Sequence, residues 1–149
     1  MTLAPSVFDG SQRLLLTAVL NRIVPANGSL AGAGDLDVAT AIEQTLSDSP
    51  YLRRVFLDGL RDIAIASAAD FASLPPAAQT DILQRVEQAQ PTFFAALVEH
   101  TYRGYYTHPQ VQRTLGSRPP QPIGYNLPPF DPALLDLQRR RAPFWRAPD

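Results

Sequence analysis

The stretch PTFFAALVEHTYRGYYTHP, residues 91–109, indicates the fold class of this protein. Proline at the first position of a helix gives up no hydrogen bond, so Pro91 is a favourable start. Apolar and aromatic residues then recur at helical spacing until His108 and Pro109, which predict the end of the helix. The stretch therefore predicts one amphipathic helix. Its broad apolar face is expected to carry Phe93, Phe94, Leu97, Val98, Thr101, Tyr102 and Tyr105.

The same helical period recurs in the preceding residues and predicts four more helices, with a further short helix around residues 111–115. Nowhere do apolar and polar residues alternate with the Asn-Gly or Asp-Gly turns of hairpins, so no strand is predicted. The expected N-caps of the four upstream helices are Asp9 or Ser11, Asp35 or Asp37, Ser49 and Ser73. The fold class is all-α, a small bundle of about five helices.

A glycine-rich segment, ANGSLAGAG at residues 26–34, separates the first two predicted helices. Small residues favour flexibility, so we interpret it as a flexible linker followed by a helix cap. The overlapping GAGDLD, residues 32–37, has two glycines of a dinucleotide fingerprint, but Asp37 stands where the third belongs. No predicted strand precedes it either, so a nucleotide site is not predicted here.

The chain changes character near Pro119, and we expect a helical domain over residues 1–118 and an extended arm over 119–149. Eight of the fifteen prolines fall in the arm, which excludes a regular helix there, apart from a short one that starts at Asp131 and ends in the arginines at 139–141. The arm is also rich in apolar and aromatic residues, more than a solvated linker needs. We therefore expect it to lie against a partner or against its own domain.

Composition excludes several classes of function. With no cysteine, the chain has no disulfide, thiolate nucleophile, cysteine-held zinc or CxxCH haem. A formal net charge of −1, with arginines that are scattered except for the run at 139–141, gives no concentrated basic face for nucleic acid. No apolar run is long enough to span a membrane. No leader is visible, which favours the cytoplasm as the sequence stands, or the periplasm if a leader was removed.

No catalytic, cofactor-binding or metal-binding site is predicted in this chain. Eight residues of helix hold His100 and His108 roughly 12 Å apart by rise alone, too far to share a metal. No GxSxG elbow occurs, and the glutamates are dispersed. Two alternatives stay open: a free-standing enzyme or ligand-binding protein that uses His108, His100 and the tyrosines in a pocket, and a homo-oligomer held by the arm.

The residues around Tyr106 favour contact with another protein, because tyrosine, tryptophan and arginine are enriched in interface hot spots. Part of this cluster is expected to be core, with Tyr106 and Arg103 on the outer side of the helix. The proline-rich and aromatic arm adds a second group of candidates. The predicted partner-binding residues are Arg103, Tyr105, Tyr106, His108, Pro120, Ile123, Tyr125, Phe130, Phe144 and Trp145.

Four segments in this order resemble the gluconate 2-dehydrogenase subunit 3 family. They are LTAVLNRIVPANGSLAGAGDLDVATAIEQTL, FASLPPAAQTDILQRVE, FFAALVEHTYRGYYTHPQVQRTLG and IGY, and the likeness covers residues 14–130. Its most telling pieces are the Ile-Val-Pro helix end before the glycine-rich segment, and the Gly-Tyr-Tyr-Thr-His-Pro run at residues 104–109.

The resemblance implies a small helical subunit without chemistry of its own. Members of the family accompany a large FAD-dependent dehydrogenase of the glucose–methanol–choline type, often with a cytochrome subunit as electron acceptor. In such complexes the large subunit holds the FAD and oxidises a sugar or alcohol hydroxyl. The small subunit supports its folding and, where a twin-arginine signal is present, its export. This chain shows no such signal.

Overall fold

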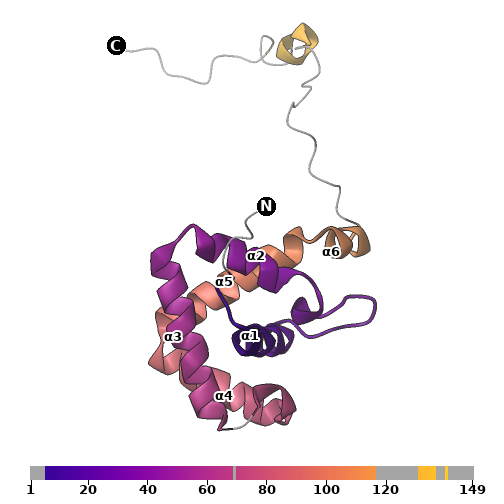
Figure 1. The fold of residues 1–149 in the computed structure, drawn as a ribbon. Helices are drawn as coiled ribbons and strands as arrows, with labels where there is room; N and C mark the ends of the chain where they lie inside the picture. Colours follow the sequence, from indigo (N-terminus) through magenta and orange to yellow (C-terminus); the bar gives the residue numbers. More distant parts are fainter. Residues whose placement is uncertain (1–5, 69, 117–130, 137–139, 141–149) are drawn as a thin grey trace, which may run out of the picture. The chain divides into compact units, whose positions relative to one another are not determined.

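The structure is a computed structural model that describes residues 6–68, 70–116, 131–136 and 140. Within these residues it consists of six α-helices and three short 3-10 helices, without a β-strand (Figure 1). The all-α prediction is confirmed. The chain divides into two units, residues 1–119 and 120–149, and all six α-helices belong to the first unit.

Helix α5 (Pro91–Thr107) is the centre of the helical unit. It contacts each of the five other α-helices described. Its buried residues, among them Phe93, Leu97 and Tyr105, form a stripe along the helix, and apolar residues of its neighbours close over this stripe. These neighbours are α1 (Gly10–Ile23), α2 (Val38–Ser47), α3 (Pro50–Ser67), α4 (Pro76–Ala89) and α6 (Pro109–Thr114).

Three helix starts lie where local chemistry predicts them. Proline is the first residue of α3 and of α5, and the Ser49 hydroxyl accepts a hydrogen bond from the Leu52 N–H at 3.4 Å. At α1 the Asp9 carboxylate accepts from the Gln12 N–H at 2.8 Å, while the Gln12 side chain accepts from the Asp9 N–H. This reciprocal pair is a capping box.

Two predicted caps are wrong. Ser73 lies in the 3-10 helix η2 (Phe71–Ser73), where its hydroxyl donates to the Asp70 carbonyl at 2.7 Å, and α4 instead begins at Pro76. The Asp37 side chain caps nothing at α2. Asp35 belongs to the 3-10 helix η1 (Ala33–Asp35) and accepts a hydrogen bond from α1. In both segments a 3-10 turn takes up the polar side chains before the α-helix starts.

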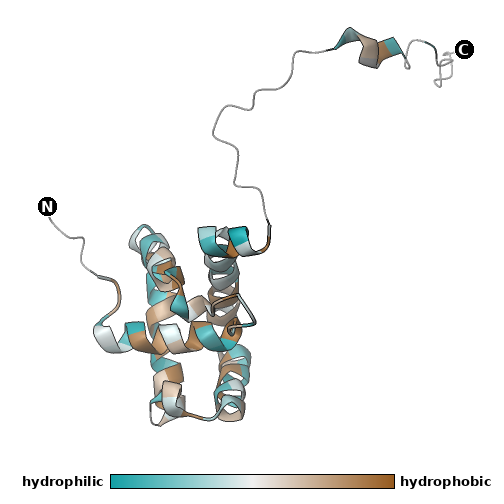
Figure 2. Cartoon of the chain, turned by 90° about the vertical axis from the view of Figure 1, so that its right-hand side faces the viewer, coloured by the Kyte–Doolittle hydropathy of each residue, from teal (hydrophilic) through white to brown (hydrophobic). Residues whose placement is uncertain are grey.

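The core is tightest where α3 meets α5. The rings of Phe56 and Phe93 pack edge to face, with centroids 5.6 Å apart and planes at 89°. Gly59 allows this approach, because a Cβ at this position would lie 2.2 Å from Cγ of Phe93. Figure 2 shows hydrophobic and hydrophilic residues interspersed along the helices, as expected when each buries one face.

The second unit has one described element, the 3-10 helix η3 (Pro132–Leu135). The Asp131 carboxylate accepts a hydrogen bond from the Ala133 N–H at 2.9 Å and so caps this turn. The short helix predicted at Asp131 is therefore present as a 3-10 turn. Its predicted end at the arginines lies mostly outside the described residues.

Glu43 on α2 holds the segment that precedes α1. One carboxylate oxygen accepts hydrogen bonds from the Ser6 hydroxyl at 2.6 Å and the Val7 N–H at 2.7 Å, and more weakly from the Phe8 N–H at 3.3 Å. The other oxygen forms an ion pair with Arg13. Burial raises the pKa of Glu43, but the hydrogen bonds and the Arg13 charge outweigh it, so this pKa is lower than usual.

This lowered pKa makes the segment sensitive to acid. The folded state holds the Glu43 proton less tightly than the unfolded chain, so the contribution of Glu43 is complete above about pH 5 and is lost as the pH falls through the folded pKa. We expect Glu43→Gln to lower the free energy of unfolding at pH 7 by about 1–2 kcal/mol. We also expect a smaller further loss between pH 6 and pH 3 than in the parent protein.

The measurement is urea unfolding at several pH values, followed by circular dichroism. Glu99→Gln is the matched control, because Glu99 forms only an exposed ion pair with Arg103 within α5. Such pairs contribute about 0.5 kcal/mol or less. Equal pH profiles for the two variants would contradict the role assigned to Glu43.

Candidate functional site

The outer side of α5 carries two exposed tyrosines that lie one helical turn apart. Tyr102 and Tyr106 are 44% and 52% exposed, and their rings stack with centroids 6.0 Å apart and planes at 30°. The exposed Arg103 lies beside them, in an ion pair with Glu99 at 2.7 Å. We call Tyr102, Arg103 and Tyr106 the tyrosine face. An aromatic pair held open to solvent with an arginine beside it has the composition of an interface hot spot.

Of the two tyrosines expected on the apolar face of α5, the structure buries only Tyr105. The Tyr105 ring is 3% exposed, and its hydroxyl donates to the Ala31 carbonyl at 2.9 Å, so its side chain belongs to the core and leaves the predicted contact surface. Burial raises the pKa of Tyr105, and the neighbouring Tyr106 adds to the shift. Tyr102, expected in the core beside Phe94, is exposed instead. The buried stripe of α5 lies nearer Thr101 than Tyr102.

The two histidines have different structural environments. His100 is 8% exposed and its ring meets Phe56 of α3 edge to face at 6.1 Å. His108 is half-buried at the start of α6, where its Nδ1 accepts from the Gln110 N–H at 3.3 Å. Among the described residues no group of three His, Asp or Glu side chains is placed to hold a metal. One histidine packs in the core and the other caps a helix.

The glycine-rich segment is docked on α1, and the flexible-linker interpretation is wrong. The Asn21 side chain accepts from the Gly34 N–H at 2.8 Å and donates to the Asp35 carboxylate at 3.0 Å. Ala33 is fully buried. A Cβ at Gly34 would lie 2.1 Å from the Thr17 carbonyl oxygen, so glycine is needed here for close approach. We call residues 26–37 the docked loop.

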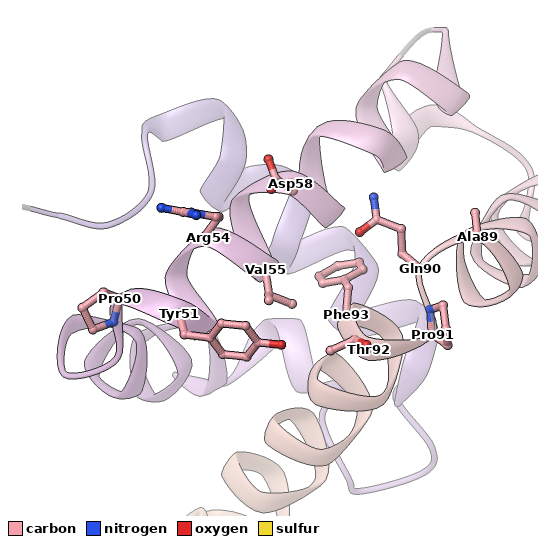
Figure 3. A pocket seen from close by; sticks show the side chains of 10 residues that line it. All are labelled: Pro50, Tyr51, Arg54, Val55, Asp58, Ala89, Gln90, Pro91, Thr92 and Phe93. Carbon is pink, nitrogen blue, oxygen red and sulfur yellow. The ribbon is translucent and has the colours of Figure 1, made fainter.

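An open hollow of about 710 Å³ lies between the start of α3 and the junction of α4 and α5. Figure 3 shows the Tyr51 side chain extending from α3 toward Thr92 at the start of α5, with Arg54 directed away from it. Tyr51 is 67% exposed. Both charge signs occur in the lining, as Arg54 and Asp58.

Two further hollows share Arg22, and one of them reaches the tyrosine face. One, of about 310 Å³, lies between α4 and α5, with Tyr102 and Arg22 among the residues that line it. The other, of about 240 Å³, lies between α1 and α4 and shares Arg22 with the first. We call the two hollows together the Arg22 groove. The sequence pattern did not single out Arg22, because it stands in the last turn of α1, where a basic residue is common.

Comparison with known proteins identifies the family. The family model described as gluconate 2-dehydrogenase subunit 3 matches residues 10–125. The chain belongs to this family. Searches of curated proteins and of solved structures found no match.

The match to the gluconate 2-dehydrogenase subunit 3 family spans all six α-helices, the docked loop and the tyrosine face. The family name implies association with other subunits of a dehydrogenase complex. None of the described helices is long and apolar enough to cross a membrane.

The remaining predicted contact residues belong to the arm and lie outside the described residues. Three of them, Phe130, Phe144 and Trp145, also follow the last residue of the family match. Their contribution to a partner surface therefore stays a prediction. The full set is Pro120, Ile123, Tyr125, Phe130, Phe144 and Trp145.

Proposed function

We propose that this chain is a non-catalytic small subunit that stabilises, and assembles with, a large FAD-dependent dehydrogenase acting on a sugar or alcohol. The flavin and the reacting groups would lie in the large subunit, and a cytochrome subunit would take up the electrons in complexes that contain one. The observation that carries the proposal is the family match across the whole helical unit.

The tyrosine face supports this proposal physically. Two stacked rings that are about half exposed lose little further side-chain freedom when a partner covers them, because the stack already restricts their rotamers. Tyrosine also offers a hydroxyl at the rim of an apolar contact. Arg103 adds a charge whose present ion pair is exposed and therefore weak.

The test is co-purification of the tagged chain from its native cell, followed by co-expression with the flavin-bearing subunit that is identified. We expect Tyr106→Ala to weaken the complex by about 1–2 kcal/mol, roughly tenfold in Kd, because it removes one ring of the stack. Binding is measured by titration of the purified subunits, and flavin content by absorbance.

Tyr51→Ala provides the matched control, because it removes another exposed tyrosine, from the start of α3. Tyr51→Ala should unfold at the parent temperature, and Tyr106→Ala slightly below it, because the Tyr106 ring also packs edge to face on Tyr105 at 5.3 Å. A chain that copurifies with no flavoprotein, or that turns over a sugar or alcohol alone, would overturn the proposal. Equal binding by the Tyr106 and Tyr51 variants would reject only the role of the tyrosine face as a partner contact.

A further inference from the structure

The Arg22 groove holds a guanidinium group that is oriented but not neutralised. Arg22 is half-buried, and its Nε–H donates to the Thr80 hydroxyl of α4 at 3.0 Å. The Thr80 hydroxyl in turn donates to the Pro76 carbonyl at 3.0 Å, which fixes the direction of its lone pairs toward Arg22. No carboxylate among the described residues forms an ion pair with Arg22. The two terminal nitrogens are therefore left to bind something else.

The charge of the groove has one sign. Arg22 is the only charged residue among those that line the two hollows, whereas the hollow beside Tyr51 contains both signs. Partial burial makes an unpaired charge costly and strengthens its attraction for an anion. The free edge of a guanidinium whose Nε is engaged matches the two oxygens of a carboxylate.

The rest of the lining is mainly apolar or amide. Ile23, Leu83, Phe94 and Val98 line the hollow between α4 and α5, and Tyr102 links it to the tyrosine face. Asn21, Gln79 and Gln84 supply amide groups that suit a peptide backbone. A small anion alone would leave the apolar part of the groove unused. A peptide with an apolar side chain near a carboxylate fits both parts.

We propose that the Arg22 groove binds a peptide segment of the dehydrogenase partner, in which an aspartate or glutamate pairs with Arg22 and a nearby aliphatic or aromatic side chain fills the hollow between α4 and α5. This inference rests on the proposed function and adds the chemistry of the segment recognised. Thr80 acts as a positioning residue, because it holds the guanidinium edge toward the segment.

Arg22 could instead serve only to stabilise α1, because a positive charge in the last turn of a helix is favourable. Arg22→Lys separates the two roles. Lysine keeps the charge at the end of α1 but lacks the planar fork and the Nε–H that donates to Thr80, so stability should fall by no more than that one hydrogen bond while partner binding falls severalfold. A fall in stability with unchanged binding would overturn the proposal.

The main test uses the purified complex of this chain with its flavin-bearing subunit. We expect Arg22→Gln to raise Kd roughly ten- to hundredfold and to reduce its dependence on salt. Arg85→Gln is the matched control, because Arg85 is exposed on α4 outside the groove and donates only to the Asp81 carbonyl. Thr80→Val should weaken binding severalfold, and Thr80→Ser should restore it.

A photo-crosslinking residue at Gln84, which is exposed and lines the hollow between α4 and α5, identifies the occupant. The expected product joins Gln84 to a segment of the flavin-bearing subunit that contains an acidic residue, and reversing that charge should abolish the advantage of Arg22 over glutamine. A crosslink to this chain's own residues, or to a second copy, would overturn the inference but leave the proposed function standing. So would equal binding by the Arg22→Gln and Arg85→Gln variants. Failure to form any complex would overturn both.

Discussion

Replacing Gly59 with leucine is expected to abolish the cooperative unfolding transition of the helical unit. A Cβ at this position would lie 2.2 Å from Cγ of Phe93, and the Phe93 ring is 1% exposed with Phe56 against its edge. The ring therefore has no free space to enter. Overpacking a tight core costs about 1–3 kcal/mol for small additions, and four added carbons should exceed that range. Domains of this size have about 5–15 kcal/mol in total.

Thermal and urea unfolding followed by circular dichroism measure this effect. Gly59→Ala gives a graded version, in which the clash outweighs the roughly 1 kcal/mol that alanine gains over glycine inside a helix. Gly10→Leu is the control, because Gly10 is the first residue of α1 and no atom lies within 4 Å of a Cβ there. If Gly59→Leu unfolds with the parent midpoint, α3 and α5 do not pack as described.

Replacing Gly34 with alanine is expected to destabilise the protein by about 3 kcal/mol. The obstacle is the Thr17 carbonyl oxygen, which would lie 2.1 Å from the new Cβ and belongs to the backbone of α1. Backbone yields less readily than the end of a flexible side chain. Relief would require the docked loop to move away from α1 and so lengthen the hydrogen bond from the Gly34 N–H to Asn21.

This substitution separates a docked loop from a flexible one. In a flexible linker, alanine would stabilise the folded state by about 0.4–1 kcal/mol, because it restricts the unfolded chain. The two interpretations therefore predict opposite signs of change in the urea midpoint. Gly10→Ala shows what the same substitution does where there is space. A midpoint for Gly34→Ala at or above the parent value would restore the flexible-linker interpretation.

Local signals in the sequence were sufficient to predict the helices. Pro50 and Pro91 begin α3 and α5. These starts were predictable because proline favours the first turn of a helix through its own backbone, without help from distant residues. The all-α class follows from the same period of apolar residues. Ser73 was misassigned because a 3-10 turn competes for the same polar side chain, and only the packing of Phe71 in the core decides between the two.

The errors concern contacts between residues distant in sequence. The small residues of the docked loop suggested flexibility, and its actual partner, Asn21, lies on another element. On α5 the apolar pattern was wide enough to include both Tyr102 and Tyr105. The choice between them depends on the Ala31 carbonyl, which receives the Tyr105 hydrogen bond across 74 positions of chain. Arg22 was missed because its environment is made by α4 and α5.

The hydrogen bond from Tyr105 to Ala31 joins two stretches that looked like separate family signatures, the Gly-rich stretch and the Gly-Tyr-Tyr-Thr-His-Pro run. Gly104 reinforces the link, because a Cβ there would lie 2.9 Å from the Val38 side chain, just beyond the loop. The two signatures are thus halves of one structural unit. In chimaeras between relatives the two stretches should be exchanged together. Exchanging one alone would put the hydrogen bond between the Tyr105 hydroxyl and the Ala31 carbonyl at risk.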